Sequence, residues 1–155
     1  MTEIRGLTLH QPWAYAITWA DKRIENRSWR YAPTYQGWIA IHAGASTGTR
    51  DDYQYAINLV AKLANLPIDI VTHGAEERSA ILAVARLASV CSDSFDMPDV
   101  VCGCGPWAFP RSRHFHLTEV HALQRPVPCK GAQKLWHLPP AVAEAIERQI
   151  PAVLS

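Results

Sequence analysis

The apolar segment Ala80–Val90 constrains the fold of this chain more than any other feature. Arg86 is its one charge, and β-branched residues are interspersed along it. A continuous apolar run of this kind is typical of a strand that is buried within a sheet. We therefore expect a central strand here, with the other elements arranged around it.

Shorter elements precede and follow this strand. Alternating or short apolar segments predict strands at Ile4–Leu9, Ile24–Trp29, Trp38–Ala43, Phe115–Leu123 and Ala132–Leu138. Helical spacing and start signals predict helices from Pro12 to about Ala20, from Thr47 to before Pro67, and from Pro139-Pro140 onward. Residues 91–113 are rich in Gly, Pro, Ser and Asp and predict a long loop. Helices interrupt a mostly β chain, which favours an α+β barrel over a doubly wound sheet.

The length and composition are those of a single globular domain covering residues 1–155. Of the 155 residues, 48% are hydrophobic, which is enough for an ordinary core. No run approaches the roughly 18 apolar residues of a membrane span. The N-terminus has an acid near its start and lacks the long apolar core of a secretory signal. We expect a cytoplasmic protein that does not interact with membranes.

The net charge of +1 hides an uneven distribution. Residues 1–50 hold six Lys/Arg and three Asp/Glu, residues 51–100 hold three and eight, and residues 101–137 hold five and one. If the two basic blocks meet in the fold, they form one positive surface that suits an anionic partner such as nucleic acid. The alternative is a solvated surface with uneven charge.

The four cysteines, at positions 91, 102, 104 and 129, leave their chemistry open. One residue separates Cys102 from Cys104, whereas zinc knuckles usually have two to four between paired cysteines. His114 and His116 follow ten and more residues later, so a Cys/His metal site is an alternative. We expect reduced, partly buried thiols, no metal and no cofactor.

The segment around residues 22–29 carries the residues best suited to chemistry. On a strand, Glu25, Arg27 and Trp29 share one face, and Lys22 precedes them at the turn. Arg27 is a candidate phosphate ligand, and Lys22 and Glu25 are candidate catalytic groups if the protein is an enzyme. A Lys–Glu ion pair is the simpler alternative.

Several further side chains are candidates for contact with nucleic acid. Aromatic rings can stack on bases, glutamine can contact a base edge, and cations can contact phosphates. Each also has an ordinary role, in the core, at a helix cap or on a solvated surface. The full set of candidates is Gln11, Trp13, Lys22, Arg27, Trp29, His42, Arg86, Trp107 and Lys130. Trp19, Trp38 and Trp136 are assigned to the core or the barrel wall.

An ordered set of short motifs spans most of the chain. They are Gln11-Pro12-Trp13-Ala14, then Lys22 to Trp29 (KRIENRSW), then Ile41-His42-Ala43, and finally Pro128 to Trp136 (PCKGAQKLW). Each motif is weak alone. Together, and in this order, they resemble bacterial and phage members of the ASCH family, within the PUA-like superfamily.

The resemblance implies a PUA-like mixed β-barrel of about five to six strands with flanking helices, and a cleft between the first helix and the barrel. ASCH relatives are thought to bind or act on RNA. We therefore expect a binding module for nucleic acid or a nucleotide, with a hydrolase acting on RNA or modified nucleosides as the alternative. The amidohydrolase-like members have a Thr three residues after the Lys, where this chain has Glu25. They also have a Glu on a later strand, where this chain carries Arg86. These departures count against their activity.

Overall fold

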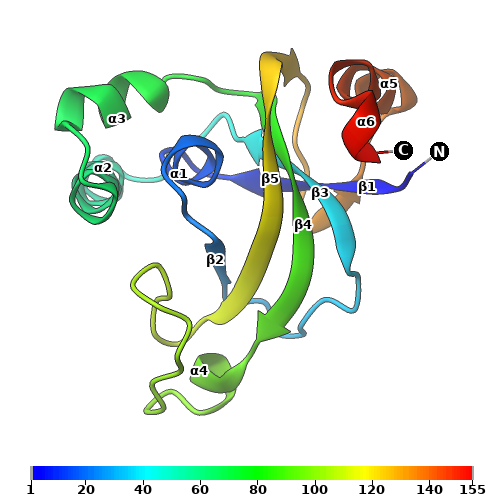
Figure 1. Ribbon diagram of the computed structural model, residues 1–155. Helices are drawn as coiled ribbons and strands as arrows, with labels where there is room; N and C mark the ends of the chain where they lie inside the picture. Colours follow the sequence, from blue (N-terminus) through cyan, green and yellow to red (C-terminus); the bar gives the residue numbers. More distant parts are fainter. Residues whose placement is uncertain (1, 155) are drawn as a thin grey trace.

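The computed structural model describes residues 2–154 and has one mixed sheet with helices on two sides (Figure 1). The strands are β1 (Ile4–Leu9), β2 (Ile24–Arg27), β3 (Gly37–Ala43), β4 (Ala80–Cys91), β5 (Arg113–Pro128) and β6 (Leu135–His137). Their order in the sheet is β2-β5-β4-β3-β1-β6. β1 and β3 pair in parallel, and the other neighbouring strands in this order pair antiparallel.

The sheet curls into a half-barrel. In Figure 1, β1 runs almost crosswise to β4 and β5. Register shifts interrupt the pairing of β4 with β5 at three places, and one more lies between β3 and β4. Such bulges increase local twist and bend a strand, so they account for much of the curl. The α+β, PUA-like architecture expected from the sequence is confirmed.

Helices cover both sides of this half-barrel. α1 (Trp13–Trp19), α2 (Arg50–Ala64) and α3 (Ile68–Gly74) lie together on one side, and α5 (Pro140–Gln149) and α6 (Pro151–Leu154) lie on the other (Figure 1). The short α4 (Asp93–Asp96) follows β4. Among residues 2–154, no helix is both long enough and apolar enough to cross a membrane.

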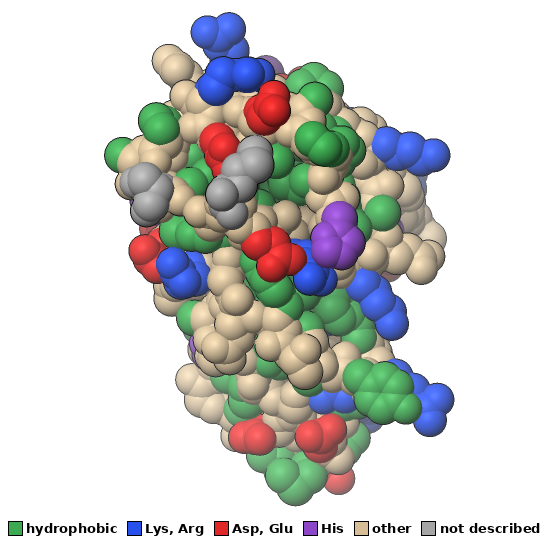
Figure 2. Space-filling view, turned by 90° about the vertical axis from the view of Figure 1, so that its right-hand side faces the viewer, with side chains coloured by type: hydrophobic (Ala, Val, Ile, Leu, Met, Phe, Trp, Pro, Cys, Tyr) green, Lys and Arg blue, Asp and Glu red, His purple; other side chains and the backbone are tan. Residues whose placement is uncertain are grey.

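Three hydrophobic clusters hold these layers together. The first packs α1 against β1, β3, β4 and β5, the second packs α5 and α6 against the other face, and the third joins α1 to α2 and α3. On the face that carries α5 and α6, acidic, basic and hydrophobic side chains lie interspersed (Figure 2). That face therefore differs from the cleft beside α1, described below, where cations and aromatic rings gather.

Most predicted elements occur where expected, and the differences have local causes. The strand predicted to reach Trp29 ends at Arg27, because the Arg113 guanidinium takes the carbonyls of Trp29 and Arg30 at 2.8 and 2.7 Å. The predicted strand at 132–138 is confined to Leu135–His137, and Lys134 before it has a positive φ of 59°. The expected loop at 91–113 contains α4.

The sequence did not predict one of the helices, and one tryptophan that it assigned to the core is exposed. α3 was not predicted, because Ile68 and Ile70 are each 48% exposed and its apolar pattern does not mark a buried face. Trp19 was assigned to the core but is 64% exposed, at the end of α1. Trp38 and Trp136 are buried as expected.

Candidate functional site

A cleft of about 540 Å³ opens between α1 and the half-barrel. We call it the main cleft. β1 contributes Thr8 and Leu9 to its wall, α1 contributes Trp13, and β2 contributes Glu25 through Arg27. Its remaining lining is His10, Trp29, Ala132, Gln133 and Lys134. Arg27 comes from the first basic block of the sequence and Lys134 from the second, so the two blocks meet here.

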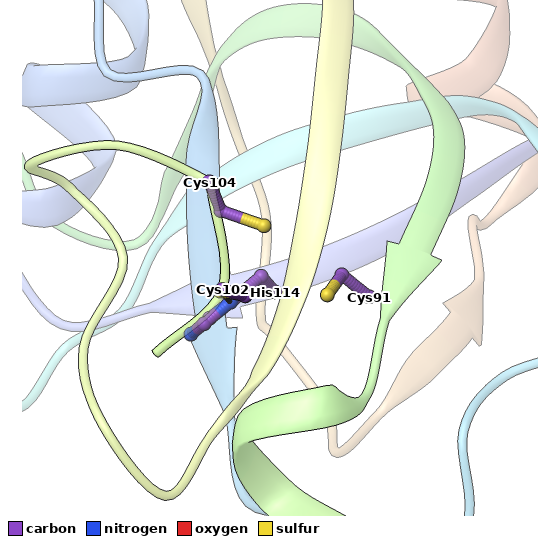
Figure 3. Close-up of side chains that lie close together, drawn as sticks. All are labelled: Cys91, Cys102, Cys104 and His114. Atoms are coloured by element: carbon purple, nitrogen blue, oxygen red, sulfur yellow. Dashed lines mark hydrogen bonds between the residues drawn. The ribbon is translucent and has the colours of Figure 1, made fainter. Parts of the chain in front are cut away.

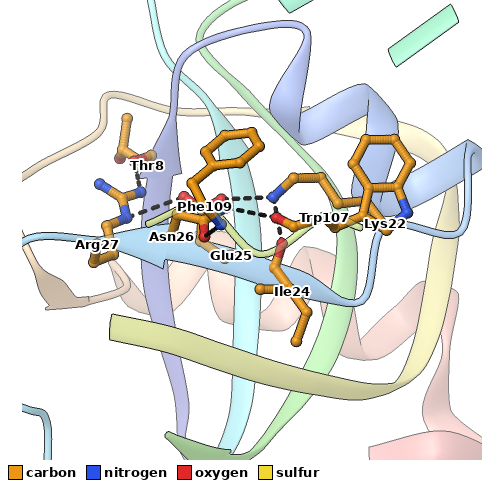
Figure 4. A network of polar contacts seen from close by, with 8 residues as sticks. All are labelled: Thr8, Lys22, Ile24, Glu25, Asn26, Arg27, Trp107 and Phe109. Atoms are coloured by element: carbon orange, nitrogen blue, oxygen red, sulfur yellow. Dashed lines mark hydrogen bonds and ion pairs between the residues drawn. The ribbon is translucent and has the colours of Figure 1, made fainter. Parts of the chain in front are cut away.

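The polar centre of this region is a chain of three charged side chains (Figure 4). Glu25 lies between two cations: its Oε1 is 3.0 Å from Lys22 Nζ, and its Oε2 is 3.0 Å from Arg27 Nε. Lys22 also donates to the carbonyl of Ile24, and Arg27 Nη2 donates to that of Thr8 at 2.7 Å. The alternation predicted for residues 24–29 brings Glu25 and Arg27 to one side of the strand.

Lys22 and Arg27 differ in their access to solvent. The Lys22 side chain is 1% exposed, and that of Arg27 is 22% exposed. Burial lowers the pKa of Lys22, and the nearby Glu25 carboxylate offsets part of this effect. Lys22 lines a smaller pocket of about 240 Å³ that shares Trp13, Glu25 and Asn26 with the main cleft.

Two tryptophans line the main cleft while resting on the core. Trp13 packs edge-on against Phe109 with ring centres 5.6 Å apart, and Trp29 packs likewise against Phe115 at 5.2 Å. The Arg27 guanidinium lies 5.7 Å from the centre of the Trp29 ring. These contacts fix the orientation of both indoles at the wall of the cleft.

Gln11 and Trp107 lie outside the lining of the main cleft. Gln11 is buried: its Oε1 accepts from the Tyr15 amide at 2.9 Å, and its Nε2 donates to the Glu77 carbonyl at 3.1 Å. It therefore caps the start of α1 and does not face a ligand. Trp107 packs against the cluster that joins α1 to α2.

His42 and Lys130 lie at an adjacent pocket of about 360 Å³, which shares Thr8, His10 and Ala132 with the main cleft. His42 is buried. Its Nδ1 is 3.1 Å from Thr8 Oγ1, and its Nε2 is 2.8 Å from the Cys129 carbonyl. Burial lowers the pKa of His42. His42 is thus the hydrogen-bonded core histidine given as its alternative role, while Lys130 is exposed at the rim.

Arg86 lies away from the main cleft. It pairs with Glu119 at 2.8 Å, and its guanidinium covers the Trp38 ring at 4.7 Å. Trp38 belongs to the hydrophobic cluster on the α5 side of the sheet. The sequence-based assignment of Arg86 to the binding surface is therefore corrected: β4 alternates, and this position faces away from α1.

Sequence reasoning missed Thr8, Asn26 and Gln133 in the wall of the cleft. Asn26 holds the loop that precedes β5: its Nδ2 donates to the Trp107 carbonyl at 2.9 Å, and its Oδ1 accepts from the Phe109 amide at 2.8 Å (Figure 4). A polar residue between two charged ones on a short strand gives little sign of such a role in the sequence.

Three of the four cysteines meet a histidine in a second polar cluster. Cys91, Cys102, Cys104 and His114 have potential ligand atoms that all lie within 4.8 Å of one another. Burial and the neighbouring thiols of Cys102 and Cys91 raise the pKa of Cys104 to about 12. The expectation of no metal rested on the short Cys102–Cys104 spacing and on an intracellular setting. The structure adds two groups that the spacing does not include, Cys91 at the end of β4 and His114 in β5.

Solved structures with a similar fold are crystal structures of ASCH from Zymomonas mobilis and of a point mutant of that protein. Each has a TM-score of 0.51 and 14% sequence identity to this chain, and each alignment covers 94% of the chain. The alignments cover 94% and 97% of the two ASCH chains, respectively. No protein-family model matches the sequence, and no curated protein matches it.

Proposed function

Since the chain has an ASCH-type fold, we propose that its main cleft binds a nucleotide or a short segment of nucleic acid, RNA in the first place. Arg27 and Lys134 contact phosphate in this proposal, and Trp29 and Trp13 contact a base. The single observation that carries it is the meeting of a partly exposed arginine and two oriented indoles in one cleft.

The size and lining of the cleft support this class of ligand. A volume of about 540 Å³ lies within the roughly 300–1,000 Å³ of small-molecule sites. Its wall combines cationic, aromatic and hydrogen-bonding side chains, which are the groups that single-stranded nucleic acid requires. Glu25 is the one acid in this lining, and its two oxygens are each paired with a cation.

Arg27 is suited to an anion because the protein fixes it without using all of its donors. Its Nε is paired with Glu25 and its Nη2 with the Thr8 carbonyl. Within residues 2–154, Nη1 has no hydrogen-bond partner, so it is available to a phosphate oxygen. A guanidinium held in this way loses little freedom when a ligand binds.

The test is a titration of the protein with short single-stranded RNA over a range of salt concentrations. Arg27→Ala should remove one phosphate contact and reduce the salt slope of log K by about 0.7–1. Trp29→Ala should weaken binding by about 1–3 kcal/mol while leaving the slope nearly unchanged, because stacking releases no counterions.

Arg86→Ala is the matched control, since it also removes one arginine but on the other side of the sheet. It should leave the affinity and the slope close to those of the parent. If Arg27→Ala and Arg86→Ala have the same effect, or if both cleft variants bind like the parent, the assignment of the cleft is refuted.

Hydrolysis of RNA or of a modified nucleoside is the second candidate. It is favoured by one observation: a buried lysine, whose pKa burial lowers, is paired with Glu25 at the smaller pocket. Glu25→Gln separates the candidates. In a hydrolase that uses this carboxylate, turnover should fall about 10²–10⁴-fold with binding retained, whereas in a binding module no product forms in parent or variant.

A further inference from the structure

Three cysteines and one histidine cluster where β4 ends and β5 begins, and together they form the donor set of a metal site. Cys91 is the last residue of β4, and its register partner in β5 is His114. The loop between α4 and β5 brings Cys102 and Cys104 to the same point. In Figure 3 the side chains of Cys91, Cys102, Cys104 and His114 lie close together beside the end of β4.

We propose that Cys91, Cys102, Cys104 and His114 bind one zinc ion in a closed, tetrahedral, structural site. Three thiolates and one imidazole form a Cys₃His set, which is one of the usual compositions of structural zinc sites. Soft sulfur ligands in a tetrahedral arrangement favour zinc over the oxygen-seeking cations.

The distances fit this geometry. With Zn–S near 2.3 Å and Zn–N near 2.0–2.1 Å, tetrahedral ligands lie about 3.5–3.8 Å apart. The four donor atoms all lie within 4.8 Å of one another, and Cys102 Sγ lies 3.2 Å from His114 Nδ1. The separations thus range from slightly below the tetrahedral value to at most about 1 Å above it, so side-chain shifts of up to about 1 Å would accommodate the ion.

The surroundings of His114 select the nitrogen that faces the metal. His114 is buried, and its Nε2 lies 2.7 Å from the Phe109 carbonyl. A carbonyl oxygen only accepts hydrogen bonds, so Nε2 carries the proton and Nδ1 of the neutral ring presents a lone pair. Metal-bound histidines commonly hold their other nitrogen in this way, which fixes the orientation of the ring.

The short Cys102–Cys104 spacing is compatible with such a site. The loop bends at residues 103 and 104, and it places both sulfurs within 4.8 Å of the other two donor atoms. Gly105 has a positive φ of 94°, which glycine adopts readily, and it turns the chain directly after Cys104. The remaining two ligands come from strands that are already paired.

The zinc site would connect the loop before β5 to the sheet, close to the residues that form the wall of the main cleft. The same loop carries Trp107 and Phe109, whose backbone groups bond to Asn26 between Glu25 and Arg27. Phe109 also packs against Trp13. Zinc would therefore hold the wall of the smaller pocket from one side while Asn26 holds it from the other.

The alternative to a metal site is a reactive cysteine paired with His114. A nucleophilic thiolate needs one histidine and an open face toward its substrate. Cys102 and His114 do line a pocket of about 200 Å³. However, two further thiols converge on the same pair, and Cys104 Sγ also lies 3.2 Å from His116 Nε2. The convergence of four donors is explained by a bound cation and is not required by a nucleophile.

The test uses tag-free protein, prepared with and without added zinc. We expect one zinc per chain by elemental analysis, and X-ray absorption with about three sulfur neighbours near 2.3 Å and one nitrogen near 2.0 Å. Cys102→Ser and His114→Ala should each weaken zinc binding by more than about 100-fold. Cys129→Ser is the matched control and should keep one zinc, because the fourth cysteine lies outside the cluster.

A measurement on the parent protein keeps the proposal testable even where a variant does not fold. Added zinc should raise the melting temperature of metal-free protein, and a chelator should reverse the rise. The proposal is overturned by a parent protein that takes up no zinc, by a bound ion with only nitrogen and oxygen neighbours, or by a disulfide among these cysteines in freshly isolated protein. Equal loss of zinc in Cys129→Ser and Cys102→Ser would also overturn it.

Discussion

Asn26 provides a sharp test of how the cleft wall is built. Its amide bridges β2 to the loop before β5 through two hydrogen bonds, to the Trp107 carbonyl at 2.9 Å and from the Phe109 amide at 2.8 Å. Asn26→Ala removes both bonds without changing the charge of the cleft. It leaves a backbone carbonyl and a backbone amide, both partly buried, without their partner.

The magnitude follows from these two bonds. Each hydrogen bond contributes about 0.5–1.5 kcal/mol net, and a buried group left without a partner costs about 1–3 kcal/mol. Because Trp107 and Phe109 are only partly buried, water can reach them in the variant. We therefore expect Asn26→Ala to lower the free energy of unfolding by about 1–3 kcal/mol.

Urea unfolding and native-state hydrogen exchange measure this change. The Phe109 amide should exchange faster in the variant. The exchange rates of amides in β4 should change only as far as the change in global stability requires. Asn58→Ala is the control: Asn58 is exposed on α2 and its side chain accepts one hydrogen bond, from Gln54 Nε2 on the same helix, so its loss should cost less than about 0.5 kcal/mol. Equal effects of the two substitutions, with unchanged Phe109 exchange, would refute the bridging role.

Two further predictions concern packing and pH. In Gly6→Ala the new Cβ would lie 2.3 Å from the Trp136 ring, so we expect a loss of about 1–3 kcal/mol in urea unfolding, and a loss below about 0.5 kcal/mol would contradict this packing. Because burial lowers the pKa of His42, the unfolded chain binds a proton there more readily than the folded one, and stability should fall as pH drops from about 6.5 toward the lowered pKa. His42→Asn should reduce this pH dependence, and an equal slope in parent and variant would contradict it.

The sheet was more predictable from the sequence than the site. Ala80–Val90 and Trp38–Ala43 are apolar runs. Strands that are buried on both faces have such runs, so they can be recognised in the sequence alone. The hydroxyl residues and two acids within 47–52 predicted the start of α2, and in the structure Thr49 Oγ1 accepts from the Asp52 amide at 3.1 Å. These signals are local, so a single sequence contains them.

The groups that build the two sites are brought together by long-range contacts, which a single sequence does not contain. The alternation at Glu25 and Arg27 gave their common face, but the approach of residues 132–134 to the same cleft depends on how the chain returns to β6. The pairing of Cys91 with His114 likewise follows from the register of β4 and β5. Gln11 and Arg86 were expected at the cleft but lie outside its lining. The sequence does not distinguish a glutamine that caps a helix, or an arginine on the other face of a strand, from a polar residue that binds a ligand.

The role of the main cleft is tested most directly by an NMR titration of isotope-labelled protein with short single-stranded RNA. We predict that the side-chain signals of Arg27 Nε and Trp29 Nε1 shift in a saturable way. Those of Arg86 and Trp38, on the opposite side of the sheet, should stay in place. Shifts confined to Arg86 and Trp38, or no saturable shift at Arg27 and Trp29, would contradict binding in this cleft.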